Sequence, residues 1–164
     1  MKKNIVTLMI MSIALLGVVA ILLLNSLQEA HDFEKRVRID RNGVVTEKLE
    51  VNDLTLNPGS KTEYTVKLKC KLEGTYDLSL VFVETEQSPL KDFVNVTVEH
   101  KGEVLKTATL AELLSGTSID LVCDLNSVEY TDLIVRFEMP LDVGNEAKGA
   151  TADFDIDMTI AIQA

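Results

Sequence analysis

The chain has 164 residues, which is enough for one ordinary domain and a targeting segment. Hydrophobic residues make up 46% of it and charged residues 26%, so the composition excludes intrinsic disorder as the overall class. Sixteen Lys and Arg stand against 26 Asp and Glu, a net charge of -10. An acidic surface repels phosphate backbones, so nucleic acid is disfavoured as a partner.

The first thirty residues predict a targeting segment. Lys2 and Lys3 precede an uncharged run from Ile5 to Leu24. At the helical rise of about 1.5 Å per residue this run spans roughly 30 Å, the hydrocarbon thickness of a bilayer. We predict a signal-anchor over residues 1–30 that crosses the cell membrane through residues 5–24, with the C-terminal domain outside. A cleaved signal peptide, which would leave the rest of the chain secreted, stays open as the alternative.

The part that follows this segment is strongly acidic and divides in two. Residues 31–164 carry a net charge of -11, because Lys2, Lys3 and Glu29 belong to the segment before them. Residues 31–43 are predicted as a stalk or a first strand, since Val37 and Ile39 suit a strand but a continued membrane helix is also possible. Residues 44–164 are predicted as the extracytoplasmic domain.

From Val37 onward apolar and polar residues alternate, which is typical of strands with one buried face. The apolar residues that share a face are, in chain order, Tyr64, Val66, Leu68, Cys70 and Leu72; Tyr76, Leu78, Leu80 and Phe82; Val94, Val96 and Val98; Leu121, Cys123 and Leu125; Leu133, Val135, Phe137 and Met139; and Phe154, Ile156, Met158, Ile160 and Ile162. Asn42-Gly43 is a strong hairpin signal and Lys101-Gly102 a weaker one.

One short helix is expected among these strands. Thr109 precedes Leu110-Ala111-Glu112-Leu113-Leu114, and Gly116 follows the run. Thr109 and Glu112 have the spacing of a capping box. The predicted fold is therefore all-β: an antiparallel β-sandwich, jelly-roll-like or Ig-like, of about eight or nine strands with one short helix, preceded by the N-terminal transmembrane helix.

Both cysteines are predicted to face the interior. Cys70 lies between Leu68 and Leu72 on an apolar face, and Cys123 is placed in the same way on another strand. A Cys70–Cys123 disulfide between two packed sheets is possible, and it would contribute about 4 kcal/mol by restricting the unfolded chain. The alternative is that both are small buried apolar side chains that do not meet.

Candidate catalytic and ligand-binding residues are few. His31 and His100 are the two histidines, and we expect both to be solvated loop residues rather than bases or ligands. Asp153, Asp155 and Asp157 form an acidic ladder, a weak candidate Ca²⁺ site, because residues two apart on a strand lie about 6.8 Å from each other. We expect instead a solubilising outer face.

A basic ladder faces outward in the same way. It consists of Lys67, Lys69 and Lys71. If its strand and the acidic one are neighbours in a sheet, their charges would pair across it; otherwise the two ladders could match between subunits.

Several stretches resemble the TasA and camelysin family of bacterial cell-surface proteins. They are Leu54-Thr55-Leu56-Asn57-Pro58-Gly59-Ser60 before a long strand, the run from Leu105 to Leu113, Phe137-Glu138-Met139-Pro140, the loop from Gly144 to Gly149, and the closing strand from Ala152 to Gln163. The resemblance implies an exported jelly-roll-like sandwich that acts at the cell surface or in the biofilm matrix. It also implies assembly in which one subunit gives an N-terminal strand, here Phe33 to Ile39, to the next.

These observations predict a non-enzymatic surface protein with a structural, adhesive or assembly role. No cofactor is expected. The expected partners are other proteins, or further copies of the chain, at the cell surface. A ligand- or Ca²⁺-binding module is the alternative. An enzyme whose site is assembled from scattered residues such as His100 is the least favoured reading.

Overall fold

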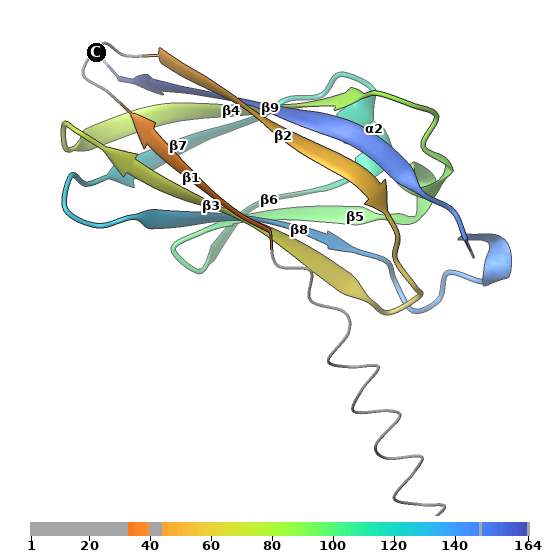
Figure 1. Ribbon diagram of the computed structural model, residues 1–164. Coiled ribbons are helices and arrows are strands. Elements are labelled where there is room, and N and C mark those ends of the chain that lie inside the picture. Colours follow the sequence, from red (N-terminus) through yellow and green to blue (C-terminus); the bar gives the residue numbers. More distant parts are fainter. Residues whose placement is uncertain (1–32, 40–43, 148, 164) are drawn as a thin grey trace, which may run out of the picture. The chain divides into compact units, whose positions relative to one another are not determined.

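The computed structural model describes residues 33–39, 44–147 and 149–163, which all belong to one compact unit. Nine strands and one short α-helix make up most of it (Figure 1). The strands are β1 (Phe33–Ile39), β2 (Val44–Leu54), β3 (Lys61–Cys70), β4 (Gly74–Glu84), β5 (Asn95–His100), β6 (Glu103–Thr109), β7 (Ile119–Leu125), β8 (Thr131–Glu138) and β9 (Ala152–Ile162). The α-helix is α2 (Leu110–Leu114), and 3-10 turns cover Pro89–Phe93 and Asn145–Ala147.

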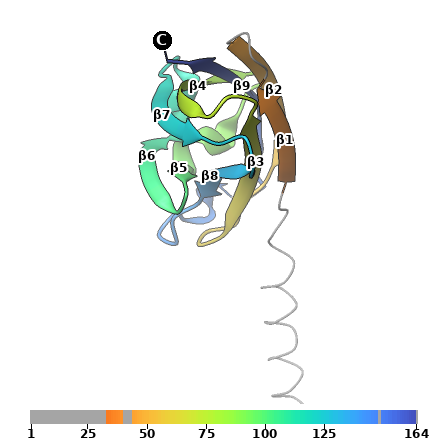
Figure 2. The same cartoon turned by 90° about the vertical axis from the view of Figure 1, so that its left-hand side faces the viewer.

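The strands form two sheets that pack face to face (Figures 1 and 2). One sheet has the order β1-β3-β8-β5-β6 and the other the order β2-β9-β4-β7. Strands β2 to β9 thus contribute four to each sheet, connected as in a jelly roll. The predicted all-β sandwich with one short helix is confirmed.

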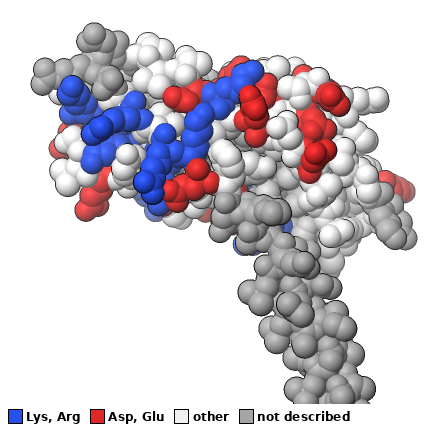
Figure 3. Space-filling model, in the orientation of Figure 1, with Lys and Arg blue, Asp and Glu red and all other residues white. Residues whose placement is uncertain are grey.

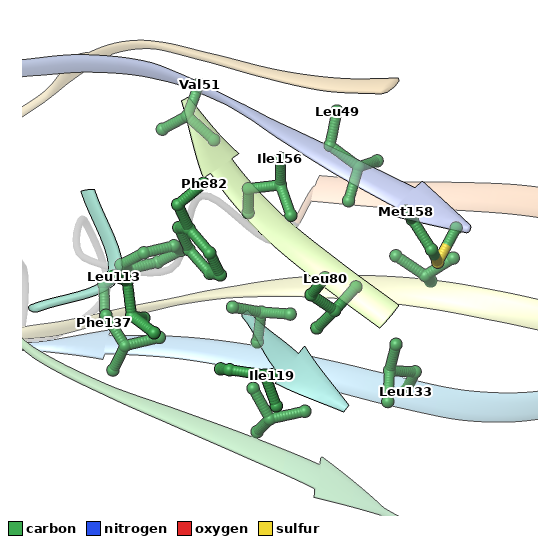
Figure 4. Close-up of a cluster of buried hydrophobic side chains, with 14 of the residues drawn as sticks. Leu49, Val51, Leu80, Phe82, Leu113, Ile119, Leu133, Phe137, Ile156 and Met158 are labelled. Carbon is green, nitrogen blue, oxygen red and sulfur yellow. The ribbon is translucent and has the colours of Figure 1, made fainter. Parts of the chain in front are cut away.

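The core lies between the sheets and follows the predicted alternation. Phe137 on one sheet meets Phe154 on the other at a ring-centroid distance of 5.5 Å, and Phe82 stacks on Phe154 at 6.0 Å. Figure 4 shows how side chains from both sheets and from α2 interdigitate there. Each fully buried side chain of this size stabilises the fold by about 2 kcal/mol.

The fully antiparallel arrangement that we predicted is wrong for β1. β1 pairs in parallel with β3, with Phe33 opposite Tyr64 and Ile39 opposite Cys70. Its inward residues Val37 and Ile39 are buried, so β1 is an integral part of the core. The six other strand pairs in the described part of the chain are antiparallel.

The predicted Asn42-Gly43 hairpin is also wrong. The two residues lie outside the described ranges, but the strands on either side of them, β1 and β2, belong to different sheets. The two strands are joined instead through side chains: the Nζ of Lys35 lies 2.9 Å from a carboxylate oxygen of Glu47 and donates to the carbonyl oxygen of Lys48. A turn signal describes local geometry only, and it does not decide which sheet the following strand joins.

Two local predictions are confirmed. Lys101 and Gly102 have φ of 52° and 80° and connect β5 to β6, the backbone that a two-residue hairpin of type I′ requires. Helix α2 begins after Thr109, whose hydroxyl accepts the N–H of Glu112 while the Glu112 carboxylate accepts the N–H of Thr109.

The prediction that Leu72 faces the interior is wrong. Strand β3 ends at Cys70, so Leu72 lies in the turn and is exposed.

The predicted membrane segment, residues 5–24, lies outside the described residues. Among residues 33–39, 44–147 and 149–163, no helix has both the length and the apolar character that crossing a bilayer needs.

Candidate functional site

The acidic ladder lies on the outer face of β9, and its members are separated from one another. The Asp155 carboxylate lies 2.9 Å from the Nζ of Lys48 on β2, and the Asp153 carboxylate accepts the backbone N–H of Asp53 at 2.8 Å. Lys48 is the cross-strand partner of Asp157. Within the described ranges, no three His, Cys, Asp or Glu side chains are grouped to hold a metal ion.

A second set of carboxylates surrounds an exposed valine on the same sheet. Val122 on β7 is 59% exposed, and its neighbours are Asp120 and Asp124 on its own strand and Asp77, its cross-strand partner on β4. Ser79 and Ser118 donate to the Asp120 carboxylate, and these hydrogen bonds lower the pKa of Asp120. We call Asp77, Asp120 and Asp124 the acidic collar.

A shallow groove lies beside Val122. Its volume is about 370 Å³, and its lining combines apolar side chains with two members of the acidic collar. The lining residues are Asp77, Leu78, Ser79, Asp120, Leu121, Val122, Thr159 and Ala161. The groove is therefore open to solvent and lined by both apolar and negatively charged side chains.

The outer face of the other sheet is basic over its strands β1 and β3. Figure 3 shows Lys and Arg side chains gathered over these two strands. We call these side chains and the ring of Tyr130 the basic surface. Its cations are Arg36, Arg38, Lys67, Lys69 and Lys71. Because β3 and β9 lie in different sheets, the two charged ladders do not pair across a sheet within one chain.

Like charges are in register on the basic surface. Arg36 is the cross-strand partner of Lys67, and Arg38 is the partner of Lys69. Glu34 lies 3.1 Å from Arg36 and 3.4 Å from Lys67, so it compensates the first pair. Arg38, Lys69 and Lys71 form no ion pair within the part of the chain that the structure describes.

Tyr130 is the aromatic centre of the basic surface. It directly precedes β8, is 43% exposed, and its ring centroid lies 5.9 Å from the Arg36 guanidinium and 5.5 Å from the Lys69 ammonium. Cations over the face of an aromatic ring are attracted to it. Lys69 also donates to the carbonyl oxygen of Val128, which fixes the loop before β8 against β3.

The two cysteines face the interior from opposite sheets, as their alternation predicts. Both are buried free thiols, Cys70 on β3 and Cys123 on β7. Burial, reinforced by the charge of Asp124, raises the pKa of the Cys123 thiol to about 11. Tyr76, the cross-strand partner of Cys123, is buried too, and its hydroxyl donates to the carbonyl oxygen of Leu72 at 2.6 Å.

His100 is not the solvated loop residue that we expected. The strand continues through it, the turn begins at Lys101, and only 7% of His100 is exposed. Neither ring nitrogen has a hydrogen-bond partner among the described residues. Burial lowers the pKa of His100 below its ordinary value, and the neighbouring charge of Lys101 acts in the same direction. His31 lies outside the described ranges.

Sequence reasoning missed Tyr130, Val122 and two members of the basic surface. Tyr130 follows a turn and has no periodic signal around it, so only the fold shows that it meets β1 and β3. Arg36 and Arg38 alternate with Val37 and Ile39, and that pattern would have extended the basic ladder had the segment been assigned as a strand.

Comparisons with known proteins give no family: no family model matches the chain, and no curated protein does. Solved structures give weak likenesses. The vertex protein P5 of PRD1 is 11% identical, with 74% of this chain and 97% of that one covered and a TM-score of 0.44. The CUB1-EGF-CUB2 domains of rat MASP-1 are 13% identical, with 79% and 43% covered and a TM-score of 0.39. A family 35 carbohydrate-binding module from an environmental isolate is 13% identical, with 68% and 76% covered and a TM-score of 0.35.

Likeness at this level carries no argument about function. The chain spans less than half of the rat MASP-1 chain that it resembles.

Proposed function

We propose that this protein is a non-enzymatic surface module that works by contact outside the cell, in a structural or adhesive role. One observation carries the proposal: a single sandwich presents an outer face with a basic surface and an opposite outer face with an acidic collar, each with an exposed apolar centre. Exposed apolar patches that are rimmed by polar residues mark interaction sites. The interior between these faces is filled by packed apolar side chains.

The resemblance to TasA and camelysin supports an assembly role. In that family an N-terminal strand of one subunit completes the next, and β1 has the position such a strand needs. It lies at the end of its sheet and pairs with β3 alone, while Val37 and Ile39 enter the core. A β1 donated by a neighbouring copy would make the same contacts with β3.

Location is part of the proposal. We infer that residues 5–24 hold the domain at the outer face of the membrane, or that their removal releases it. Mass spectrometry of the protein from its native membrane separates the two cases. If the anchor is retained, the mass of the intact chain includes residues 1–30.

The function itself is tested by looking for assemblies and partners. We expect electron microscopy of residues 31–164 to show particles larger than one chain, or affinity purification of the full chain from membranes to recover a surface protein. A chain that stays monomeric up to high concentration and recovers no partner would contradict the proposal.

A further inference from the structure

We propose that the basic surface around Tyr130 binds the acidic groove beside Val122 of a second copy of this chain, so that copies stack into an open chain. This inference rests on the proposed function and names the partner for the assembly role. It requires no exchange of β1, and it involves only residues that the structure describes.

The first argument is the charge arrangement on β1 and β3. Like charges placed directly opposite each other destabilise a sheet. Arg38 and Lys69 are such a pair, and Lys71 adds a third cation that lacks an ion pair among the described residues. A carboxylate surface laid on this face would relieve that repulsion, so the basic surface has the charge of a binding site for an anionic partner.

The second argument is that the chain itself carries the complementary face. The acidic collar contributes Asp77, Asp120 and Asp124, and no ion pair involves these three within the described ranges. On a strand, residues two apart repeat at about 6.8 Å, and both the collar and the basic surface are built on that repeat. Two outer sheet faces can therefore bring cations and carboxylates opposite each other at several positions at once.

The third argument is the shape and polarity at the two centres. Tyr130 is 43% exposed on the basic surface, and the groove beside Val122 has apolar side chains in its lining and a volume of about 370 Å³. A groove of this volume is large enough to take one phenol ring. Tyr and Arg are enriched among the residues that carry most of the binding energy at protein interfaces.

The position of the two surfaces decides the kind of assembly. They lie on opposite outer faces of the sandwich. Two copies in contact can therefore join only one basic surface to one acidic groove, and the other two surfaces stay free. The contact is therefore head-to-tail, and such contacts continue into open chains unless a rotation closes them.

A long anionic polymer fits the basic surface less well. The chain is acidic as a whole, so a polymer that extends beyond the basic surface meets a protein of like charge. A second copy brings the carboxylates of the collar together with the apolar side chains of the groove, which a polymer of charged units does not offer. At physiological salt charges act over about 8 Å, so the charges that face each other across the contact decide the affinity.

Two neutralised variants of the full chain test the stacking, both in mild non-ionic detergent. One, Arg38→Gln with Lys69→Gln, removes charge from the basic surface only; the other, Asp77→Asn with Asp120→Asn, removes charge from the acidic collar only. Sedimentation velocity should show a concentration-dependent series of oligomers for the unaltered chain. Each variant alone should associate at least tenfold more weakly.

Mixing the two variants is the decisive step. Each keeps one intact surface, so an equimolar mixture should form a dimer of one copy of each and nothing larger. This result would also show that both variants are folded. The matched controls, Lys61→Gln with Lys106→Gln and Glu103→Gln with Glu138→Gln, remove the same number of charges elsewhere and should assemble like the unaltered chain.

The inference is overturned if both variants assemble like the unaltered chain, or if their mixture stays monomeric. It is also overturned if the unaltered chain is monomeric but binds dextran sulfate through Arg38 and Lys69. A monomeric chain that still recovers a different surface protein would overturn this inference alone. A monomeric chain without any partner would overturn the proposed function as well.

Discussion

At the residue scale, the unusual feature is a set of polar side chains buried within an apolar interior. Cys70, Tyr76, His100 and Cys123 all point inward from the sheets, and the His100 ring lacks a hydrogen-bond partner among the described residues. Burying a polar group without a partner costs stability. Burial shifts the pKa of Tyr76, His100 and Cys123, so the protonation of these three groups is linked to folding, and this linkage can be measured.

The stability of the protein should fall as the pH is lowered from about 7.5 to 5.5. The pKa of His100 is lower in the folded chain than in the unfolded one, so the unfolded state binds more protons in this range and is favoured as pH falls. The charge of Lys101 lowers the pKa of His100, while the charge of Asp124 and the backbone of Asp132 act in the opposite direction. Urea unfolding of residues 31–164 at both pH values measures the effect, and a His100→Leu variant should lose most of it. An equal pH dependence in the variant would show that other groups are responsible.

The two thiols should be unreactive in the native protein at pH 8. Both are buried, and the high pKa of Cys123 leaves little thiolate. Labelling with a chromogenic disulfide reagent should find almost no thiol in the folded chain and two per chain in guanidinium. If no thiol appears in guanidinium before reduction, the cysteines are bridged, the alternative that the sequence leaves open.

Calcium should not stabilise the domain. Asp155 is paired with Lys48, Asp153 accepts a backbone N–H, and neighbouring members of the ladder are about 6.8 Å apart. Millimolar Ca²⁺ should therefore leave the Tm of residues 31–164 unchanged. The alternative function, a Ca²⁺-binding module, would be favoured if Ca²⁺ raised the Tm of the unaltered domain but not that of an Asp155→Ala variant.

At the scale of elements, local sequence signals predicted the buried faces of strands and the helix cap, but they did not predict how β1 pairs. The alternation of β9 and of β4 identified the buried faces, and the capping box of α2 was identified from Thr109 and Glu112 alone. The parallel pairing of β1 with β3 could not be predicted, because it depends on the path of the chain between two sheets. His100 was misplaced because the strand before the Lys101-Gly102 turn is longer than its apolar run.

β1 should contribute to stability like any core strand. Ile39 is fully buried, so Ile39→Ala should lower the free energy of unfolding by about 2–5 kcal/mol. Arg38→Ala, on the outer face of the same strand, is the matched control and should change it by less than about 1 kcal/mol. Denaturant unfolding of residues 31–164 measures both. Equal and small effects would mean that β1 is not docked in solution.

At the scale of the whole molecule, the sandwich separates its charges. A basic surface lies on one outer face and an acidic collar on the other, although the net charge is strongly negative. The sequence predicted the two ladders from alternation alone. It could not show that a loop residue, Tyr130, completes one surface or that Val122 lies at the centre of the other, because both depend on which strands become neighbours.

Site-specific photo-crosslinking in living cells tests this account most directly. The full chain would carry a photoreactive benzophenone amino acid in place of Tyr130. We expect irradiation to give a species of twice the chain mass, in which position 130 is joined to the peptide that contains Val122 of another copy. The same amino acid at Leu141, an exposed site at a different turn, should not give this product. A crosslink from position 130 to a different molecule, or none, would contradict the account.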